Sequence, residues 1–260
     1  MRLKDKRALV TGGSSGLGRA IALRFAREGA AVAITGRRAD ALEDTARLVR
    51  ESGGTAITIV ADHARAADSE AAVAHAAQAL GGLDVVVNNA GVIGFDGVLD
   101  SNPTELHRLM DVNFFGVYEV SRHAAAHLVR SAADGRDASI LNVSSVAGLR
   151  PYPGLVGYCV SKAAVDMLTD VTALELAPKK VRVNAVNPGV VVTNLHLATG
   201  MDDARYRAFL DRSRETHPLG RPGTPEDVAS LAVFLSSDEA GWITGGHHSI
   251  DGGRALTSLR

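Results

Sequence analysis

The sequence predicts an α/β fold in which a doubly wound parallel sheet forms one domain over residues 1–260. Short, nearly continuous apolar runs alternate with longer segments of helical periodicity along the chain. This is the pattern of strands that are covered by helices on both faces. No linker rich in Pro, Gly or Ser interrupts the alternation, and right-handed crossovers between parallel strands would produce the doubly wound arrangement.

The first half of the chain contains four of the expected strands. The second and third helices run into Gly53-Gly54 and Gly81-Gly82, and glycine adopts the left-handed conformation that commonly ends helices. Residues 55–60 are rich in β-branched side chains, which favour strands. The expected strands are 8–10, 31–35, 55–60 and 83–87, and the expected helices are 16–28, 39–51 and 66–80.

The second half continues the alternation with longer helices. The expected helices are 103–129, 157–176 and 225–235, and the expected strands are 139–143, 181–186 and 248–250. Residues 194–217 form the longest stretch without a firm role, although 204–210 suit a short helix. Because this stretch follows the end of a strand, we expect it to be mobile and to close over a ligand.

Composition and charge exclude several classes of partner. The formal net charge is -1 and aromatic residues make up 4%, so nothing favours binding to nucleic acid or to an anionic membrane. No run of about 18 apolar residues is present, hence no membrane-spanning helix is expected. Cys159 is the single cysteine, and residues 1–7 do not resemble a signal peptide. Together these features favour a reducing, cytoplasmic location.

Glycines occupy the turn between the first expected strand and the first expected helix. Residues 11–18 read Thr-Gly-Gly-Ser-Ser-Gly-Leu-Gly. Glycine lets a pyrophosphate approach the helix N-terminus, where free N–H groups and the helix dipole favour an anion. No Gly-Lys-Ser/Thr follows, so a P-loop is excluded. The turn predicts a dinucleotide site with contacts from Gly12, Ser14, Ser15, Gly16, Leu17 and Gly18.

Arg37 and Arg38 follow the second strand, where an NAD site usually places a carboxylate for the ribose 2′-hydroxyl. Here Thr35 and Gly36 precede the arginines, and no acid is present. Arginine can bind a 2′-phosphate through paired donors, so NADP(H) is the predicted cofactor. The alternative is that both arginines only begin a solvated helix.

Tyr158 and Lys162 stand four residues apart on an expected helix, so their side chains emerge on one face. A lysine cation near the phenol could lower its pKa by roughly two to three units, into the range useful for proton transfer. Ser145 follows an expected strand and can donate a hydrogen bond to the same substrate oxygen. Taken alone, this spacing more often marks an amphipathic helix whose lysine reaches solvent, and Ser144 competes with Ser145.

Further motifs follow in a fixed order along the chain. They are Asp62, Asn88–Gly91, Asn113, Pro188–Thr193, Gly220–Val228, Thr244–Gly246 and Asp251–Gly253. With the glycine turn, Ser145, Tyr158 and Lys162, this order resembles the classical short-chain dehydrogenase/reductase family over essentially the whole chain. The resemblance implies a Rossmann-like fold and an oxidoreductase that transfers a hydride between NADP(H) and a secondary alcohol or ketone.

The resemblance also implies the roles of individual residues. In the implied catalytic tetrad, Tyr158 is the general acid/base and Ser145 polarises the substrate oxygen. Lys162 would lower the tyrosine pKa and bind the nicotinamide ribose, and Asn113 would hold a water that links Lys162 to solvent. The implied cofactor contacts are Asp62, His63, Asn89, Ala90, Gly91, Tyr158, Lys162, Pro188, Gly189, Val191 and Thr193.

Two other features have simpler interpretations. Cys159 lies beside Tyr158, but a small residue in a buried helix is far more common there than a nucleophile. His123 and His127 share a helix face at metal-ligand spacing, yet no third ligand is apparent, so no metal is expected.

The substrate pocket implied by the resemblance draws on residues 93–95, Val146, 149–150, Tyr152 and 194–217. Its apolar members suit a hydrophobic secondary alcohol or ketone, although such loops vary freely. Arg150 could meet an acidic substrate, but a surface arginine is the commoner outcome. The resemblance further implies a homotetramer in which helices 103–129 and 157–176 pack across subunits.

The sequence leaves rival functions to be compared. The preferred one is an enzyme that uses NADP(H), and the main alternative is an NAD-dependent alcohol dehydrogenase of the same family. A redox sensor that binds a dinucleotide without turnover belongs to a different class. The complete tetrad favours an enzyme, because a protein that only binds the dinucleotide gains nothing from Ser145 or Tyr158.

Overall fold

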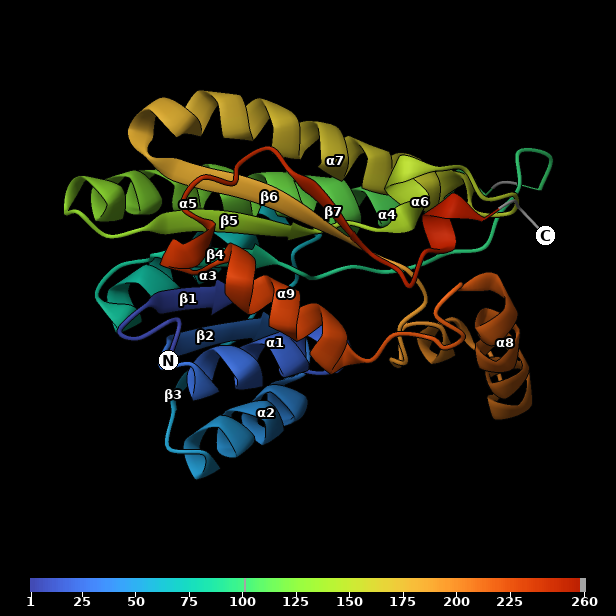
Figure 1. The fold of residues 1–260 in the computed structure, drawn as a ribbon, viewed down its shortest axis with the longest axis horizontal. Coiled ribbons are helices and arrows are strands. Elements are labelled where there is room, and N and C mark those ends of the chain that lie inside the picture. The colour runs from blue at the N-terminus through green and yellow to red at the C-terminus, as the bar shows by residue number, and fades with distance from the viewer. Residues whose placement is uncertain (101, 258–260) are drawn as a thin grey trace.

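A computed structural model describes residues 1–100 and 102–257 (Figure 1). Residues 101 and 258–260 belong to the predicted domain but lie outside the described residues. Seven parallel strands of the described chain form one sheet in the order β3-β2-β1-β4-β5-β6-β7, which confirms the predicted fold class. The strands are β1 (Arg7–Val10), β2 (Ala31–Gly36), β3 (Thr55–Val60), β4 (Val85–Asn88), β5 (Ala138–Val143), β6 (Val181–Pro188) and β7 (His247–Ile250).

Helices cover both faces of the sheet because successive strand side chains point to opposite sides. Val10 of β1 packs in the hydrophobic core between the sheet and one helical layer. Its neighbour Leu9 packs in the core on the opposite face of the sheet. The first layer consists of α1 (Gly16–Arg27), α2 (Ala39–Glu51) and α9 (Pro225–Leu235). The second layer consists of α3 (Ala66–Leu80), α5 (Gly116–Ala133) and α7 (Val156–Leu176). Figure 1 shows α5 and α7 across the sheet from α1, α2 and α9.

The helix expected over residues 103–129 is interrupted. It consists of α4 (Pro103–Met110), a π-helical turn (Asp111–Phe115) and α5. The π turn carries Asn113, whose fully buried side chain binds the main chain of Val92. A π turn adds a residue to a helix, and the apolar periodicity of the sequence gave no signal of it.

The segment after β6 is more helical than expected. Where a short helix over 204–210 is predicted, α8 (Asp203–Thr216) is twice as long, and the Asp202 side chain caps it by accepting a hydrogen bond from the Arg205 N–H at 2.8 Å. Figure 1 shows α8 standing clear of the sheet, and Ser213 is its one buried residue. The remaining short pieces are α6 (Val146–Leu149) and 3-10 turns at Ala177–Lys179, Leu197–Thr199, Asp238–Ala240 and Arg254–Leu256.

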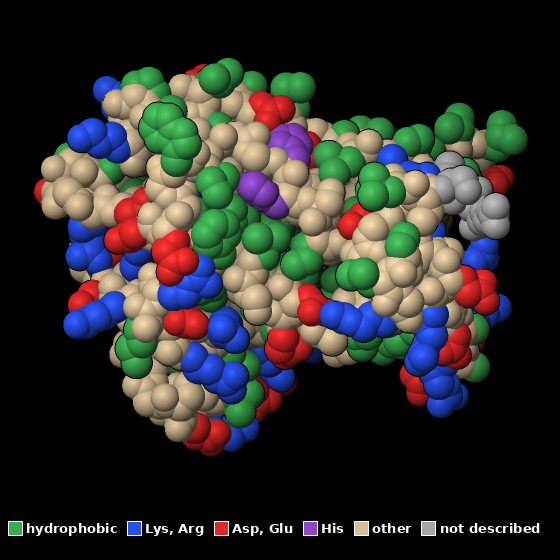
Figure 2. All heavy atoms as spheres, viewed as in Figure 1, with side chains coloured by type: hydrophobic (Ala, Val, Ile, Leu, Met, Phe, Trp, Pro, Cys, Tyr) green, Lys and Arg blue, Asp and Glu red, His purple; other side chains and the backbone are tan. Residues whose placement is uncertain are grey.

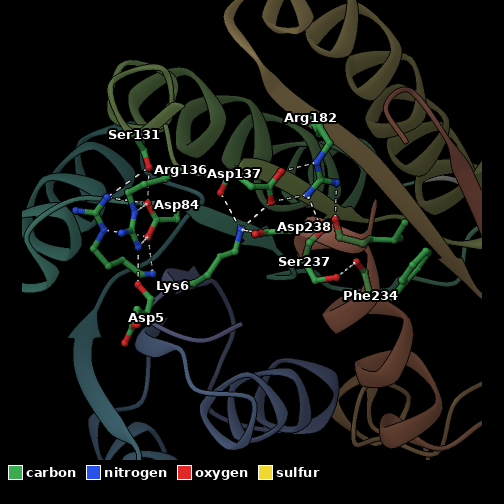
Figure 3. Close-up of polar contacts among 12 residues, drawn as sticks. Asp5, Lys6, Asp84, Ser131, Arg136, Asp137, Arg182, Phe234, Ser237 and Asp238 are labelled. Atoms are coloured by element: carbon green, nitrogen blue, oxygen red, sulfur yellow. Dashed lines mark hydrogen bonds and ion pairs between the residues drawn. The ribbon is translucent and has the colours of Figure 1, made fainter. Parts of the chain in front are cut away.

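Two side-chain networks join the amino ends of the strands, at the edge opposite the glycine turn (Figure 3). Asp84, just before β4, binds Arg7 and Arg136, each at 2.7 Å, and also accepts from Ser131. Burial would raise the pKa of Asp84, but its hydrogen bonds from Arg136, Arg7 and Ser131 hold it well below the usual range.

The second network is centred on Asp137, just before β5. Its carboxylate binds Lys6 at 2.7 Å and Arg182 at 2.8 Å, and Arg182 also donates to the Leu235 carbonyl at 2.7 Å. The last turn of α9 is thereby tied to the sheet.

Elsewhere the surface carries charges of both signs, and Figure 2 shows basic and acidic side chains interspersed around α2 and α8. No helix of the described chain is both long and apolar enough to cross a membrane.

Candidate active site

A cleft of about 1370 Å³ opens at the carboxyl ends of the strands. Parallel sheets of this kind bind ligands where the strand order reverses, here between β1 and β4. All the residues predicted for catalysis or cofactor binding line this cleft except Gly18 and Asn113. The chain therefore gathers residues from nearly its full length around one cavity.

The glycine turn packs too tightly for larger residues. Gly12 has a positive φ of 66°, and a Cβ on Gly18 would lie 2.2 Å from the Gly12 carbonyl oxygen. Gly18 thus lets α1 pack against the turn. The Asn89 amide braces the same turn by donating to the Thr11 and Gly12 carbonyls at 2.8 and 3.2 Å. Ser15, which precedes α1, makes no side-chain cap, so the first N–H groups of the helix remain available to an anion.

Arg37 and Arg38 are exposed and line the cleft beyond the end of β2. Neither forms an ion pair with a carboxylate of the described chain. Arg19 supports the turn from behind by donating to the Ser14 carbonyl at 2.8 Å and to Thr45 at 2.9 Å. The sequence did not single out Arg19, because its contacts depend on how α1 and α2 pack.

Asp62 and His63 follow β3 but differ in exposure. The Asp62 carboxylate accepts from the Ala64 N–H at 3.2 Å. The His63 ring is buried between Thr35 and Ser69, at 2.6 and 2.9 Å, and burial lowers its pKa to about 4. His63 is therefore neutral at physiological pH, and its ring holds the β3–α3 connection in place.

Ser145, Tyr158 and Lys162 lie together in the wall of the cleft, and all three are buried. Ser145 Oγ accepts from the Ala147 N–H at 3.1 Å and shares a hydrogen bond with Tyr158. Ser144 instead donates to the Lys162 carbonyl at 3.2 Å. Both serines line the cleft, but the hydroxyl that hydrogen-bonds to Tyr158 is that of Ser145.

The pKa of Tyr158 corrects one expectation. The sequence predicts that Lys162 lowers it, but burial raises it to about 12, which the Ser145 hydrogen bond offsets only in part. Lys162 Nζ donates to the Val143 carbonyl at 2.9 Å and lies 5.8 Å from the Tyr158 ring centroid. Burial lowers the pKa of Lys162 itself to about 8, against the raising effect of Asp166. At neutral pH the phenol keeps its proton, and most of the lysine is charged.

Asn113 lies beneath the cleft rather than in its wall. Its amide donates to the Val92 carbonyl and to Ser161 at 2.9 and 3.0 Å, and accepts from the Val92 N–H at 2.8 Å. A Cβ on Gly91 would lie 3.4 Å from Asn113 Oδ1 and 3.6 Å from Lys162 Nζ. Both amide protons of Asn113 are engaged in hydrogen bonds. Asn113 therefore holds in place the loop at Gly91 and Val92, and Gly91 lies between Asn113 and Lys162.

The segment after β6 forms the wall nearest to α8. Pro188, Gly189, Val191 and Thr193 all line the cleft. The Tyr206 hydroxyl of α8 donates to the Thr193 carbonyl at 2.9 Å and accepts from the Thr193 N–H at 3.1 Å. This pair of hydrogen bonds ties α8 to the cleft.

The far end of the cleft has mostly apolar and aromatic walls. Phe95, Val146, Tyr152, Leu155, Leu195, His196 and Phe209 line it. The ring of His196 lies 4.5 Å from that of Phe209, and burial lowers its pKa. Leu149 and Arg150, predicted to line the pocket, lie outside it. Arg254, which the sequence analysis missed, lines the cleft in their place.

The described residues offer no group of three or more His, Cys, Asp or Glu side chains that could hold a metal ion. His123 lies instead 3.4 Å from Glu119 on the surface of α5. Burial raises the pKa of the Cys159 thiol, which makes this cysteine a weaker nucleophile.

The chain is similar to known proteins over nearly its whole length. A family model described as Enoyl-(Acyl carrier protein) reductase matches residues 12–255. The chain is 38% identical to 2-(S)-hydroxypropyl-CoM dehydrogenase 3 of Xanthobacter autotrophicus, covering 97% of each chain. It is also 38% identical to the NADP-dependent (R)-specific alcohol dehydrogenase of Lentilactobacillus kefiri, again over 97% of each. Among solved structures, it is similar to the 3-ketoacyl-(acyl-carrier-protein) reductase of Brucella melitensis complexed with NADH, with 38% identity, a TM-score of 0.88 and coverage of 97% and 99%.

Proposed function

Because the chain belongs to the short-chain dehydrogenase/reductase family of NAD(P)-dependent oxidoreductases, we propose that it interconverts a secondary alcohol and a ketone with NADP(H), using Tyr158 as the general acid/base. The observation that carries the proposal is the burial of Tyr158, Ser145 and Lys162 in the cleft that the glycine turn borders. A sensor that only binds the dinucleotide would gain nothing from Ser145 or Tyr158.

The residues present fit a dinucleotide. The turn at Gly12 and Gly18 leaves no room for a Cβ, while the N-terminus of α1 offers free N–H groups to a pyrophosphate. Asp62 would bind the adenine, and Lys162 and the segment 188–193 would hold the nicotinamide end. When bound, the cofactor supplies the hydride, and the protein supplies position and charge.

The side chains of the tetrad then handle the proton and the substrate oxygen. Tyr158 keeps its proton at neutral pH and gives it to the carbonyl oxygen during reduction. The Ser145 hydroxyl hydrogen-bonds to Tyr158 and would donate its proton to the same oxygen once a substrate is bound. The charge of Lys162 stabilises the phenolate that remains, and Asn113 holds the loop beside it.

Arg37 and Arg38 support a preference for NADP(H). Both are exposed in the cleft and have no carboxylate partner within the described residues, so they can bind a 2′-phosphate through charge-assisted hydrogen bonds. An NADP-dependent relative agrees with this, whereas another relative was solved with NADH. NAD-linked oxidation of the same alcohols is therefore the second candidate.

A panel of ketones and secondary alcohols, followed at 340 nm with each cofactor in turn, tests the proposal. The expected result is turnover of at least one ketone with NADPH and a higher kcat/KM with NADPH than with NADH. An absence of turnover across a broad panel with either cofactor would contradict the enzymatic function.

The proposed assembly is a homotetramer in the cytoplasm, without nucleic-acid or membrane partners. Figure 2 shows hydrophobic side chains along the face formed by α7, and Val160, Met167, Val171 and Leu174 of that helix are exposed. A second copy of the chain would cover such a face. Light scattering should therefore give four times the 27.1-kDa mass of one chain, and a monomer mass would contradict the assembly.

A further inference from the structure

The substrate end of the cleft contains an arginine that no part of the proposed function uses. Arg254 lines the cleft and is partly buried, and its guanidinium carbon lies 5.5 Å from the centroid of the Tyr152 ring. Its guanidinium donates a long hydrogen bond of 3.5 Å to the Thr216 carbonyl and also hydrogen-bonds to Tyr152. Within the described chain it forms no ion pair. Most of its donors are therefore available to a ligand.

Other contacts hold the Arg254 backbone in place. Arg150 reaches across from α6 and donates to the Arg254 and Ala255 carbonyls at 3.1 and 2.8 Å. Asp251 accepts from the Gly253 and Ala255 N–H groups at 3.0 and 2.6 Å. The carboxylate of Asp251 is thereby directed at the main chain rather than at the guanidinium. These contacts hold the 3-10 turn Arg254–Leu256 in place. Less conformational entropy is therefore lost when the Arg254 side chain binds a ligand.

Tyr152 offers a second polar group at the same place. Its hydroxyl oxygen is buried beside Arg254, its proton has no acceptor among the described residues, and the ring lines the cleft. Burial raises the pKa of this phenol, and the positive charges of Arg254 and Arg150 oppose the rise. A buried hydroxyl proton without an acceptor costs free energy, and a bound oxyanion would accept it.

The acidic residues that line this end of the cleft are mostly engaged. Glu105 pairs with Arg108 at 2.6 Å, and Asp96 is buried where it accepts from the Gly157 N–H at the start of α7. Asp100 is exposed to solvent. None of the three forms an ion pair with Arg254, so its charge is left without a direct counterion beside the apolar walls.

From this arrangement we propose that the substrate carries an oxyanion, a carboxylate or sulfonate, which Arg254 binds through its forked donors with the Tyr152 hydroxyl as a further donor. The reacting carbonyl would lie toward Tyr158 and the apolar body between Phe95, Leu155 and Phe209. This inference rests on the proposed function and adds the class of substrate. From the sequence alone, Arg150 was considered as the residue that could meet an acidic substrate. The structure instead has Arg150 bind the Arg254 and Ala255 carbonyls, and we assign that role to Arg254.

Binding of a ketone in the presence of NADP⁺ tests the inference without turnover, because the oxidised cofactor cannot reduce a ketone. Isothermal calorimetry would compare 4-acetylbenzoate, 4-acetylbenzenesulfonate and the neutral methyl 4-acetylbenzoate. The parent protein should bind one of the anions at least about tenfold more tightly than the ester, and the tighter anion identifies the group. Arg254→Gln should lower the affinity for that anion by roughly 10- to 100-fold, the range expected for the loss of a charge-assisted hydrogen bond.

Controls separate recognition from folding. The ester should bind Arg254→Gln within about twofold of the parent, and Arg254→Lys should keep part of the anion preference. Arg130→Gln, at an exposed position on α5 outside the cleft, should leave both affinities unchanged. Equal weakening of anion and ester in Arg254→Gln, or no anion preference in the parent, would overturn the inference. If the anion preference holds but NADPH reduces none of these ketones or any other in the panel, the proposed reaction fails and the oxyanion site stands.

Discussion

Tyr158 and Lys162 show how burial decides the charge of a catalytic pair. The sequence spacing suggests that the lysine cation dominates, yet both groups are buried, and removal from water disfavours each charged form. The pKa of the phenol rises to about 12 and that of the lysine falls to about 8. The proton stays on the tyrosine at neutral pH, which suits the reduction of a ketone.

The pH dependence of reduction should follow Lys162. As pH rises through about 8, Lys162 loses its proton, and the charge that stabilises the phenolate is lost, so kcat/KM should fall on the alkaline side. The Asp166 carboxylate raises the pKa of Lys162. Asp166→Asn should therefore move the alkaline limb to lower pH, whereas Asp170→Asn, one turn further along α7, should move it much less. Identical alkaline limbs in parent and Asp166→Asn would contradict this account.

Cofactor preference should depend on Gly36 and Arg37. A Cβ on Gly36 would meet Leu42 and Ser14 at an ordinary 3.5 Å, so an aspartate fits there and would repel a 2′-phosphate. The parent should prefer NADPH by roughly ten- to fortyfold in kcat/KM, as expected for one charge-assisted contact. Gly36→Asp with Arg37→Ile should reverse this preference, and Arg47→Ile, on the exposed face of α2, should not. Equal use of NADH by the parent would refute the assignment.

Residues with a sequence motif were easier to predict than residues brought in by tertiary packing. The glycine turn, Ser145, Tyr158 and Lys162 each follow a local pattern, and the three catalytic residues and most of the turn line the cleft. Arg254 carries no motif, because it reaches the cleft only through the 3-10 turn that Arg150 clamps. Arg150 was considered for the site because the family resemblance places its segment at the substrate pocket, but its guanidinium donates to backbone carbonyls.

Helices and strands with a clear hydrophobic face were predicted nearly to their ends, since burial against the sheet sets their boundaries. The π turn at Asp111–Phe115 was not predicted, because it depends on the hydrogen bonds between the Asn113 side chain and the Val92 main chain. The length of α8 was underestimated. Its apolar residues are few, and its polar cap at Asp202 is a weaker sequence signal than a hydrophobic stripe.

The segment 194–217 should be the most mobile part of the protein without cofactor. α8 stands clear of the sheet in Figure 1 and buries one residue, Ser213. Few buried contacts mean a low free energy of local opening. Hydrogen exchange should be fast in this segment and should slow when NADPH is added, while α1 serves as a protected reference. Slow exchange throughout the segment without cofactor would contradict the prediction.

Stability and function are separated between opposite edges of the sheet. The carboxyl ends of the strands hold the cleft, and the amino ends hold the networks around Asp84 and Asp137 (Figure 3). The side chain of Asp84 is 1% exposed. Substitutions at this edge should therefore lower stability without altering chemistry.

Asp84→Asn should lower the free energy of unfolding by roughly 3 kcal/mol at pH 7, the lower end for a broken buried ion pair, because both arginines keep some contact with water. The folded-state pKa of Asp84 is lowered, so its contribution is present above the unfolded pKa of about 3.9 and is lost as pH falls below it. Urea unfolding should therefore show a smaller difference from the parent near pH 3. Asp238→Asn, at an exposed partner of Lys6, should cost less than about 1 kcal/mol, and equal losses for both variants would contradict this.

The most direct test of the proposed chemistry is the turnover of Tyr158→Phe. This change keeps the buried ring and removes only the hydroxyl, so NADPH affinity and thermal stability should stay close to those of the parent. Turnover of a ketone that the parent reduces should fall by at least about 100-fold, the low end for lost acid/base catalysis. Turnover within a few-fold of the parent, with cofactor affinity intact, would contradict the assignment of Tyr158 as the proton donor.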